Sequence, residues 1–259
     1  MTTERKVAVI TGAGTGVGAA TALMLAHKGY DVLVNYSRSA DEANASAADC
    51  RAAGADALVM KGDVAQDADC RALAQAAQDR WGRIDALINN AGISVFGTAA
   101  EWDALDVETF QRILGVNTLG TFQMVRACVE ALRRVQGSIV NVSSVAGALG
   151  VGSSIPYIAS KGAINAMTLH LARALAPVVR VNAVCPGLIT TGWFVRAVGE
   201  QAYEAGLKRY EATVPLQRAC SREDVAEAIV WLVDGAKTVT GELLMLDSGM
   251  HLAGAPATR

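Results

Sequence analysis

The sequence has few of the residues that mark several common classes of protein. It contains only five cysteines in 259 residues, namely Cys50, Cys70, Cys128, Cys185 and Cys220. No two of them form the Cys-x-x-Cys pair typical of zinc sites and redox centres. We interpret them as buried or incidental thiols in a reducing compartment, and we therefore expect a cytoplasmic protein.

An excess of either charge is also missing. The chain has 23 lysines and arginines against 25 acidic residues, a formal net charge of -2, and no basic cluster. This balance favours neither nucleic acid nor an anionic membrane as a main partner. The N-terminal residues, Met1 to Lys6, lack the apolar region and cleavage site of a signal peptide.

No charged residue occurs between Arg134 and Lys161. Serines, asparagine, several glycines and Pro156 interrupt this run, so we do not interpret it as a membrane span. The chain also lacks a Gly-x-Ser-x-Gly motif, and its three histidines have neither triad partners nor metal-ligand spacing. A hydrolase and a metal site are therefore not expected.

What the sequence does contain is an alternation of apolar strand-like runs and helix-like segments, with 52% hydrophobic residues. Because the units alternate without a linker, we predict one doubly wound α/β domain over residues 1–259. The predicted strands are Val7–Ile10, Asp31–Tyr36, Ala57–Lys61, Ile84–Ile88, Gly137–Val142, Val178–Val184 and Gly241–Leu246.

A glycine-rich turn follows the first strand and precedes a helix-like stretch. Its glycines are Gly12, Gly14, Gly16 and Gly18. Glycines there let the backbone approach a ligand, and the helix N-terminus offers amides to a pyrophosphate. The spacing is not the usual Gly-x-Gly-x-x-Gly, and a tight turn without a ligand is the alternative.

The end of the second strand bears on cofactor choice. An acid there would bind the ribose hydroxyls of NAD and repel the extra phosphate of NADP. The chain instead has Tyr36, Ser37 and Arg38, a set suited to a phosphate. We predict NADP, although Arg38 taken alone could be a solvated loop residue.

Three further residues suggest catalysis. A long helix is predicted from Ile155 to Leu175, and on it Tyr157 and Lys161 are four residues apart and share a face. A fixed ammonium should lower the pKa of the phenol and make it a general acid and base. Ser144 follows an apolar strand and could bind the oxygen that Tyr157 protonates. Alone, a Tyr-x-x-x-Lys pair would more often be incidental.

Two other segments attract attention. Residues Val107 to Arg134 predict a long helix, possibly bent near Gly115, with Asn117 inside it as either a satisfied core amide or a water-binding residue. Residues Leu188 to Leu216 lack a strong core pattern, and we predict a substrate-loop region there, with a subunit contact as the alternative.

Together, the glycine turn, Asn89-Asn90-Ala91-Gly92, Ser144, Tyr157-x-x-x-Lys161 and Pro186-Gly187 closely resemble the single-domain short-chain dehydrogenase/reductases, including the 3-oxoacyl reductases. The resemblance covers essentially the whole chain. It implies a Rossmann fold with a seven-stranded parallel sheet. It also implies Tyr157 as proton donor or acceptor, Lys161 as its activator and ribose ligand, Ser144 as carbonyl stabiliser and Asn117 as a water anchor.

The resemblance also implies a cofactor site. Its residues here are Gly12, Thr15, Gly16, Val17, Gly18, Tyr36, Ser37, Arg38, Asp63, Val64, Asn90, Ala91, Gly92, Tyr157, Lys161, Pro186, Gly187, Ile189 and Thr191. Many NADP-using members have an arginine where this chain has Thr15. The phosphate would then rest on Ser37 and Arg38 alone, and NAD stays an alternative.

The expected reaction transfers hydride between NADP(H) and a carbonyl or secondary alcohol, and the family favours a homotetramer. The competing interpretation is a non-catalytic NAD(P)-binding regulator on the same fold. The complete Ser, Tyr, Lys and Asn set argues against it. Residues that could line the substrate pocket are Ser94, Val95, Phe96, Ala146, Leu149, Ile155, Trp193 and Tyr203.

Overall fold

Seven parallel strands form one sheet in the order β3-β2-β1-β4-β5-β6-β7. The computed structural model describes residues 5–95, 105–192, 195 and 199–252. The strands are β1 (Lys6–Ile10), β2 (Tyr30–Tyr36), β3 (Ala57–Lys61), β4 (Ala86–Asn89), β5 (Ser138–Val142), β6 (Arg180–Pro186) and β7 (Leu243–Leu246). The predicted fold class is confirmed, because helices cover both faces of this parallel sheet.

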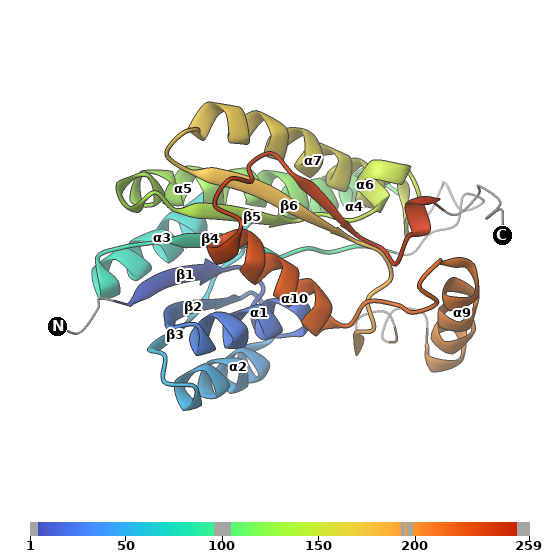
Figure 1. Cartoon of the computed structure of the whole chain (residues 1–259), viewed down its shortest axis with the longest axis horizontal. Coiled ribbons are helices and arrows are strands. Elements are labelled where there is room, and N and C mark those ends of the chain that lie inside the picture. The colour runs from blue at the N-terminus through green and yellow to red at the C-terminus, as the bar shows by residue number, and fades with distance from the viewer. Residues whose placement is uncertain (1–4, 96–104, 193–194, 196–198, 253–259) are drawn as a thin grey trace.

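Two helical layers enclose the sheet (Figure 1). One face carries α1 (Gly16–His27), α2 (Ala40–Ala52) and α10 (Arg222–Val230); the other carries α3 (Asp67–Trp81), α5 (Gly120–Val135) and α7 (Ile155–Leu175). Each layer buries its own apolar cluster against the sheet. Strands buried on both faces are continuous apolar runs, which explains why β1 is recognisable from sequence alone.

The predicted long helix over residues 107–134 is interrupted where a bend was expected. It consists of α4 (Val107–Leu114), a five-residue π-helical turn (Gly115–Leu119) and α5. A Cβ on Gly120 would lie 2.7 Å from Cγ2 of Val64, so the chain can pass there only with glycine. The π turn contains Asn117 and places it, fully buried, behind the end of β4.

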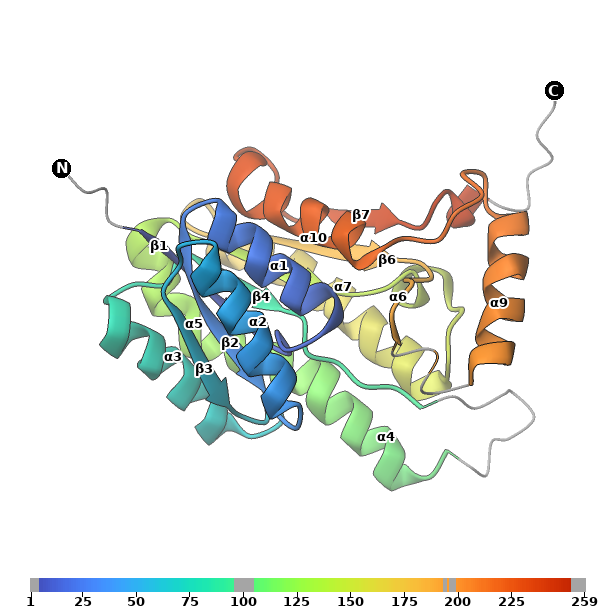
Figure 2. The same cartoon turned by 90° about the horizontal axis from the view of Figure 1, so that it is seen from below.

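The substrate-loop region differs most from expectation. Residues 200–213 form a regular helix, α9 (Glu200–Thr213), which the sequence did not predict. No residue of α9 is fully buried, but its partly buried Tyr203, Leu207 and Tyr210 recur at helical spacing, and this pattern is the signal that could have revealed the helix. Figure 2 shows α9 standing apart from both helical layers, beside the carboxyl ends of β6 and β7.

Short elements complete the carboxyl edge of the sheet. These are α6 (Ala146–Leu149) and a 3-10 turn at Met250–Leu252. The π turn Trp231–Gly235 after α10 lies at the opposite, amino edge, where Asp234 pairs with Lys6 at the start of β1 and Arg180 at the start of β6 donates to the Leu232 carbonyl. Within the described ranges, no helix is long and apolar enough to cross a membrane.

Candidate active site

The turn between β1 and α1 is tied to the end of β4. Thr11 Oγ1 accepts hydrogen bonds from the backbone amides of Asn90 and Ala91, both at 3.0 Å. The Asn90 side-chain amide in turn donates to the carbonyls of Thr11 and Gly12. The turn is therefore preorganised, with the N-terminus of α1 opening into the space beside it.

The glycines of this turn have different tasks. Gly12 and Gly16 have φ angles of +62° and +56°, which L side chains rarely adopt. Gly18 does not line the cleft; a Cβ there would lie 2.4 Å from the carbonyl oxygen of Gly12. Its role is to let α1 pack directly under the turn.

Asn35, on β2, is a structural residue of this turn that the sequence analysis missed. Its Oδ1 accepts from the Gly12 amide at 3.2 Å, and its Nδ2 donates to the Gly62 carbonyl at 3.0 Å. It thereby links the turn to the end of β3. An asparagine inside an otherwise apolar strand is the signal that could have revealed it, since buried amides require partners.

The neighbouring ends of β2 and β3 form a cationic corner. Tyr36 pairs with Lys61 in the parallel ladder, and the chain continues directly into Ser37 and Arg38. All four residues line one cleft, with Lys61 and Arg38 exposed. Lys61 was not predicted, because a lysine at a strand end is usually solvated, and only the strand order places it beside Arg38.

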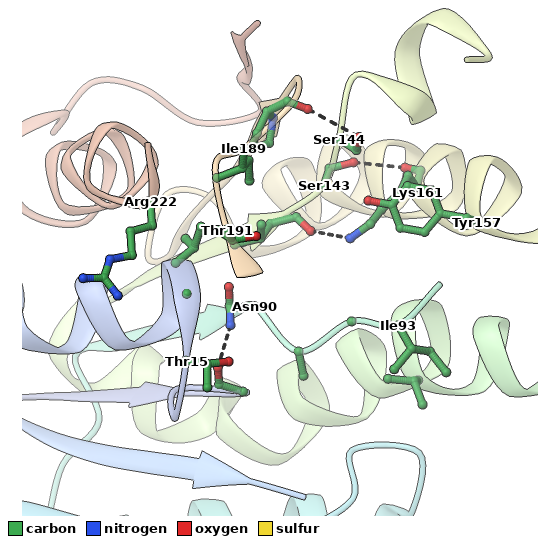
Figure 3. Close-up of a pocket in the computed structure, with 18 of the residues that line it drawn as sticks. Thr15, Asn90, Ile93, Ser143, Ser144, Tyr157, Lys161, Ile189, Thr191 and Arg222 are labelled. Carbon is green, nitrogen blue, oxygen red and sulfur yellow. Dashed lines mark hydrogen bonds between the residues drawn. The ribbon is translucent and has the colours of Figure 1, made fainter. Parts of the chain in front are cut away.

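The three proposed catalytic side chains meet at the other side of the same cleft (Figure 3). Tyr157 and Lys161 leave one face of α7, and Ser144 follows β5. Ser144 Oγ accepts from the Ala146 amide at 3.1 Å, makes a long 3.4 Å contact to the Pro186 carbonyl and also interacts with the Tyr157 hydroxyl. The long contact is weak, so a better acceptor placed beside Tyr157 could replace it.

The electrostatics of Tyr157 differ from the prediction. Burial raises the pKa of Tyr157, and the neighbouring Ser144 hydroxyl only partly offsets this. The predicted lowering of the Tyr157 pKa is therefore wrong for the protein without a dinucleotide. Lys161 Nζ donates instead to the Val142 carbonyl at 2.8 Å and lies 5.5 Å from the centroid of the tyrosine ring, so it does not offset the effect of burial. Tyr157 therefore holds its proton at neutral pH.

Lys161 is itself strongly perturbed. Its side chain is only 4% exposed, and burial lowers its pKa from 10.5 to about 8. An ammonium buried with one hydrogen bond has unused donors. Gly92 lies close to it, since a Cβ there would be 3.7 Å from Lys161 Nζ. These donors are directed at the space where the cleft meets α7.

Asn117 lies behind this group and does not line the cleft. Its Oδ1 accepts from the Ile93 amide at 2.8 Å, and its Nδ2 donates to the Ile93 carbonyl and to Ser160 Oγ, both at 3.0 Å. The side chain is thus a satisfied core amide, one of the two alternatives left open by the sequence. It fixes the Gly92–Ile93 loop against Lys161.

One cleft of about 1620 Å³ contains all the other predicted site residues except Gly18. Among the residues that the structure describes, five cationic side chains and a single carboxylate, Asp63, line it; the cations are Arg38, Lys61, Arg112, Lys161 and Arg222. In a chain of net charge -2, this concentration of positive charge indicates a polyanionic ligand.

Most of the predicted substrate-pocket residues fall elsewhere. Ala146 lines the cleft, whereas Ser94, Val95, Leu149, Ile155 and Tyr203 are not among its lining residues. Phe96 and Trp193 lie outside the described residues. Ser94 Oγ lies 2.6 Å from Oγ of Ser153, which does line the cleft, so Ser94 supports that wall from behind.

Tyr210 and Met250 form a part of the cleft that the sequence did not indicate. The Tyr210 hydroxyl, on α9, donates to the Asp247 carbonyl at 2.9 Å. A Cβ on Gly187 would lie 2.3 Å from that hydroxyl, so glycine at 187 is what allows α9 to dock. Tyr210 is 23 positions from Gly187 and 37 from Asp247 along the chain. No local sequence pattern could therefore reveal these contacts.

Comparison with protein families agrees with this geometry. The model of the short chain dehydrogenase family matches residues 6–201, which carry the glycine turn, Ser144, Tyr157 and Lys161. The chain belongs to the short-chain dehydrogenase/reductases. The family implies a nicotinamide dinucleotide, NAD or NADP, as cofactor.

Individual relatives of this short-chain dehydrogenase/reductase cover nearly its full length. It is 42% identical over 250 residues to "Granaticin polyketide synthase putative ketoacyl reductase 2" of Streptomyces violaceoruber, covering 96% of this chain and 97% of that protein. It is 32% identical over 255 residues to the 3-oxoacyl-[acyl-carrier-protein] reductase FabG of Staphylococcus aureus, covering 95% and 98%.

A solved structure gives the same result. The chain is similar to "a putative short-chain dehydrogenase/reductase from Burkholderia xenovorans", with a TM-score of 0.90 and 40% sequence identity over 96% of this chain and 99% of that one. The residues present here fit a dinucleotide: the turn at Gly12–Gly16 leaves room for a pyrophosphate, and the cleft is long, continuous and cationic.

Proposed function

We propose that the protein is an NADPH-dependent ketoreductase acting on a ketone of the 3-oxoacyl type, with Tyr157 as the proton donor. One observation carries the proposal: Ser144, Tyr157 and Lys161 converge in the cleft whose other end is the cationic corner of Ser37, Arg38 and Lys61. The names of the ketoacyl and 3-oxoacyl reductases to which the chain is similar support the substrate class.

A bound NADPH would supply the hydride to the carbonyl carbon. The protein's own task is to hold and protonate the carbonyl oxygen. Ser144 donates a hydrogen bond to that oxygen, and Tyr157 transfers its proton to it as negative charge develops. Because burial raises the pKa of Tyr157, the phenol keeps its proton at neutral pH but is a weak acid, so the transfer depends on stabilisation of the tyrosinate that it leaves.

Lys161 favours the tyrosinate formed after this transfer. The ammonium lies close enough to the ring to stabilise a negative phenolate oxygen in surroundings of low polarity. It would also hold the nicotinamide ribose, using donors that its bond to Val142 leaves over. Asn117 positions the Ile93 loop beside it.

NADP is favoured over NAD by the charges at the cationic corner. No carboxylate follows β2, and Arg38 and Lys61 both line the cleft. Thr15 stands where an arginine is common in NADP-using relatives, and we propose that Lys61 takes over the charge that this arginine would provide. Asp63 and Val64 would contact the adenine, and Ile189 and Thr191 the carboxamide.

The assembly we propose is a homotetramer with α5 and α7 at one interface. Large apolar side chains are exposed near their surfaces: Leu119 is 47% exposed, Phe122 43% and Leu169 37%. Unpartnered apolar residues on adjacent helices are typical of a subunit contact. Light scattering of the purified protein measures the mass directly, and a monomer would refute this part.

The decisive experiment is a carbonyl panel. Purified protein is incubated with NADPH or NADH and with simple ketones, 3-oxoesters and 3-oxoacyl thioesters, and nicotinamide oxidation is followed by absorbance. We expect turnover of a 3-oxo compound and a higher kcat/KM with NADPH. Tight dinucleotide binding without turnover of any carbonyl would instead support the non-catalytic regulator.

A further inference from the structure

Arg222 is a cleft residue to which neither the sequence motifs nor the mechanism above assigns a role. It is the first residue of α10, at the positive end of the helix dipole, where a cation is unfavourable. Its ion pair is with the adjacent Glu223, both side chains being about half exposed, and such pairs contribute little to stability. Arg222 is therefore not at this position to stabilise the helix.

The backbone just before Arg222 is hydrogen-bonded to the loop from Leu188 to Thr191, called the carboxamide loop because its Ile189 and Thr191 are the proposed carboxamide contacts. The Thr190 amide donates to the Cys220 carbonyl at 2.8 Å, and the Cys220 amide donates to the Leu188 carbonyl at 3.0 Å. A capping box between Ser221 and Asp224 then fixes the start of α10. These bonds place the root of the Arg222 side chain next to Thr191.

Across the cleft from Arg222 lies the N-terminus of α1. A Cβ on Gly16 would lie 3.9 Å from Cγ2 of Thr191, so the carboxamide loop approaches the first turn of α1 closely. Figure 3 shows the Arg222 side chain descending from α10 toward α1, on the same side as Thr191. Both residues line the cleft together with Gly14 and Thr15.

We infer that Arg222 binds the pyrophosphate of the dinucleotide from the α10 side, opposite the amides of α1. The inference rests on the proposed dinucleotide site and goes beyond it by adding a charged ligand for the pyrophosphate. α1 has no basic residue in its first turn, so its dipole alone would otherwise face two negative charges. A guanidinium binds phosphate oxygens in a bidentate manner. Arg222 could leave its ion pair with Glu223 and bind the phosphate by rotating its own side chain.

This role predicts a specific binding signature. The pyrophosphate is common to NAD and NADP, so Arg222 should strengthen the binding of both by the same factor. Arg38 and Lys61, at the cationic corner, should strengthen the binding of NADP alone. The two groups of cations are therefore distinguishable by equilibrium binding without any substrate.

The test is isothermal titration calorimetry of the nucleotide-free protein with NADP⁺ and with NAD⁺. We expect Arg222→Gln to weaken both by about tenfold, the usual size of a charge-assisted hydrogen bond in a solvent-accessible site. Arg222→Lys should weaken binding less, because lysine keeps the positive charge and loses only the bidentate hydrogen bonding of the guanidinium. Thermal unfolding should show Arg222→Gln at least as stable as wild type, since it removes a cation from a helix N-terminus.

The matched control is Arg218→Gln. Arg218 also pairs with an acid of the same helical turn, Asp224, but does not line the cleft. An unchanged affinity for Arg222→Gln overturns the inference, as does a loss confined to NADP⁺ or an equal loss in Arg218→Gln. Failure of the wild-type protein to bind either dinucleotide would instead refute the proposed function, and the inference with it.

Discussion

Replacing Lys161 by methionine is expected to make the nucleotide-free protein more stable while it loses its activity. Lys161 is buried, and its ammonium is held inside the protein at neutral pH with one hydrogen bond, to the Val142 carbonyl. Methionine has a similar length and no charge, so it fits the same space without desolvating an ion.

The magnitude follows from the pKa of Lys161, which burial lowers from 10.5 to about 8. At about 1.4 kcal/mol for each unit, keeping the ammonium buried at pH 7 costs about 3 kcal/mol of folding free energy. Losing the donor to the Val142 carbonyl costs about 1 kcal/mol. The variant should therefore gain about 2 kcal/mol, which raises Tm by about 4 to 8 °C in a domain of this size.

The pH dependence separates this electrostatic effect from packing. The folded-state pKa of this base lies below its unfolded value, so the cost of the buried ammonium is complete below about pH 8 and fades as the pH rises toward 10.5. Between pH 7 and pH 10 the advantage of the methionine variant should shrink by about 2.5 kcal/mol.

Chemical denaturation at the two pH values measures this difference, with ketone reduction assayed in parallel. A stability difference between variant and wild type that does not change with pH would refute the reasoning about the buried charge. Retention of wild-type activity, with an unaltered pH–rate profile, would refute the role of Lys161 in assisting Tyr157.

Three further changes test other parts of the site. Tyr157→Phe should reduce ketone reduction by at least about a hundredfold, while calorimetry still detects NADPH binding; comparable turnover would exclude Tyr157 as the proton donor. Lys61→Gln should raise KM for NADPH by about fivefold and leave KM for NADH unchanged, and equal effects on both would contradict a contact with the 2′-phosphate. Tyr210→Phe removes the hydrogen bond from α9 to Asp247 and should loosen α9 against the cleft. We expect KM for the ketone to rise while KM for NADPH stays constant; an unchanged KM for the ketone would show that α9 does not position the substrate.

The sequence by itself was sufficient for the fold class and for most of the predicted dinucleotide and catalytic residues that line the cleft. Strands buried on both faces have continuous apolar sequences. The turn that begins at Gly12 contains glycines in backbone conformations that other residues rarely adopt. Tyr157 and Lys161 are one helical turn apart, so their shared face depends only on local geometry. Features encoded within a few residues of one another were predictable.

The tertiary structure alone decided what depends on distant segments. Lys61 joins the cationic corner only because β3 lies beside β2. Arg222 enters the cleft because Cys220, two residues before it, is hydrogen-bonded to Leu188 and Thr190. The pKa of Tyr157 rises where its spacing from Lys161 suggested a fall, because the surrounding chain desolvates the phenol and the Ser144 hydroxyl offsets this only in part. Burial is set by what packs around a residue, and that information is spread over the whole chain.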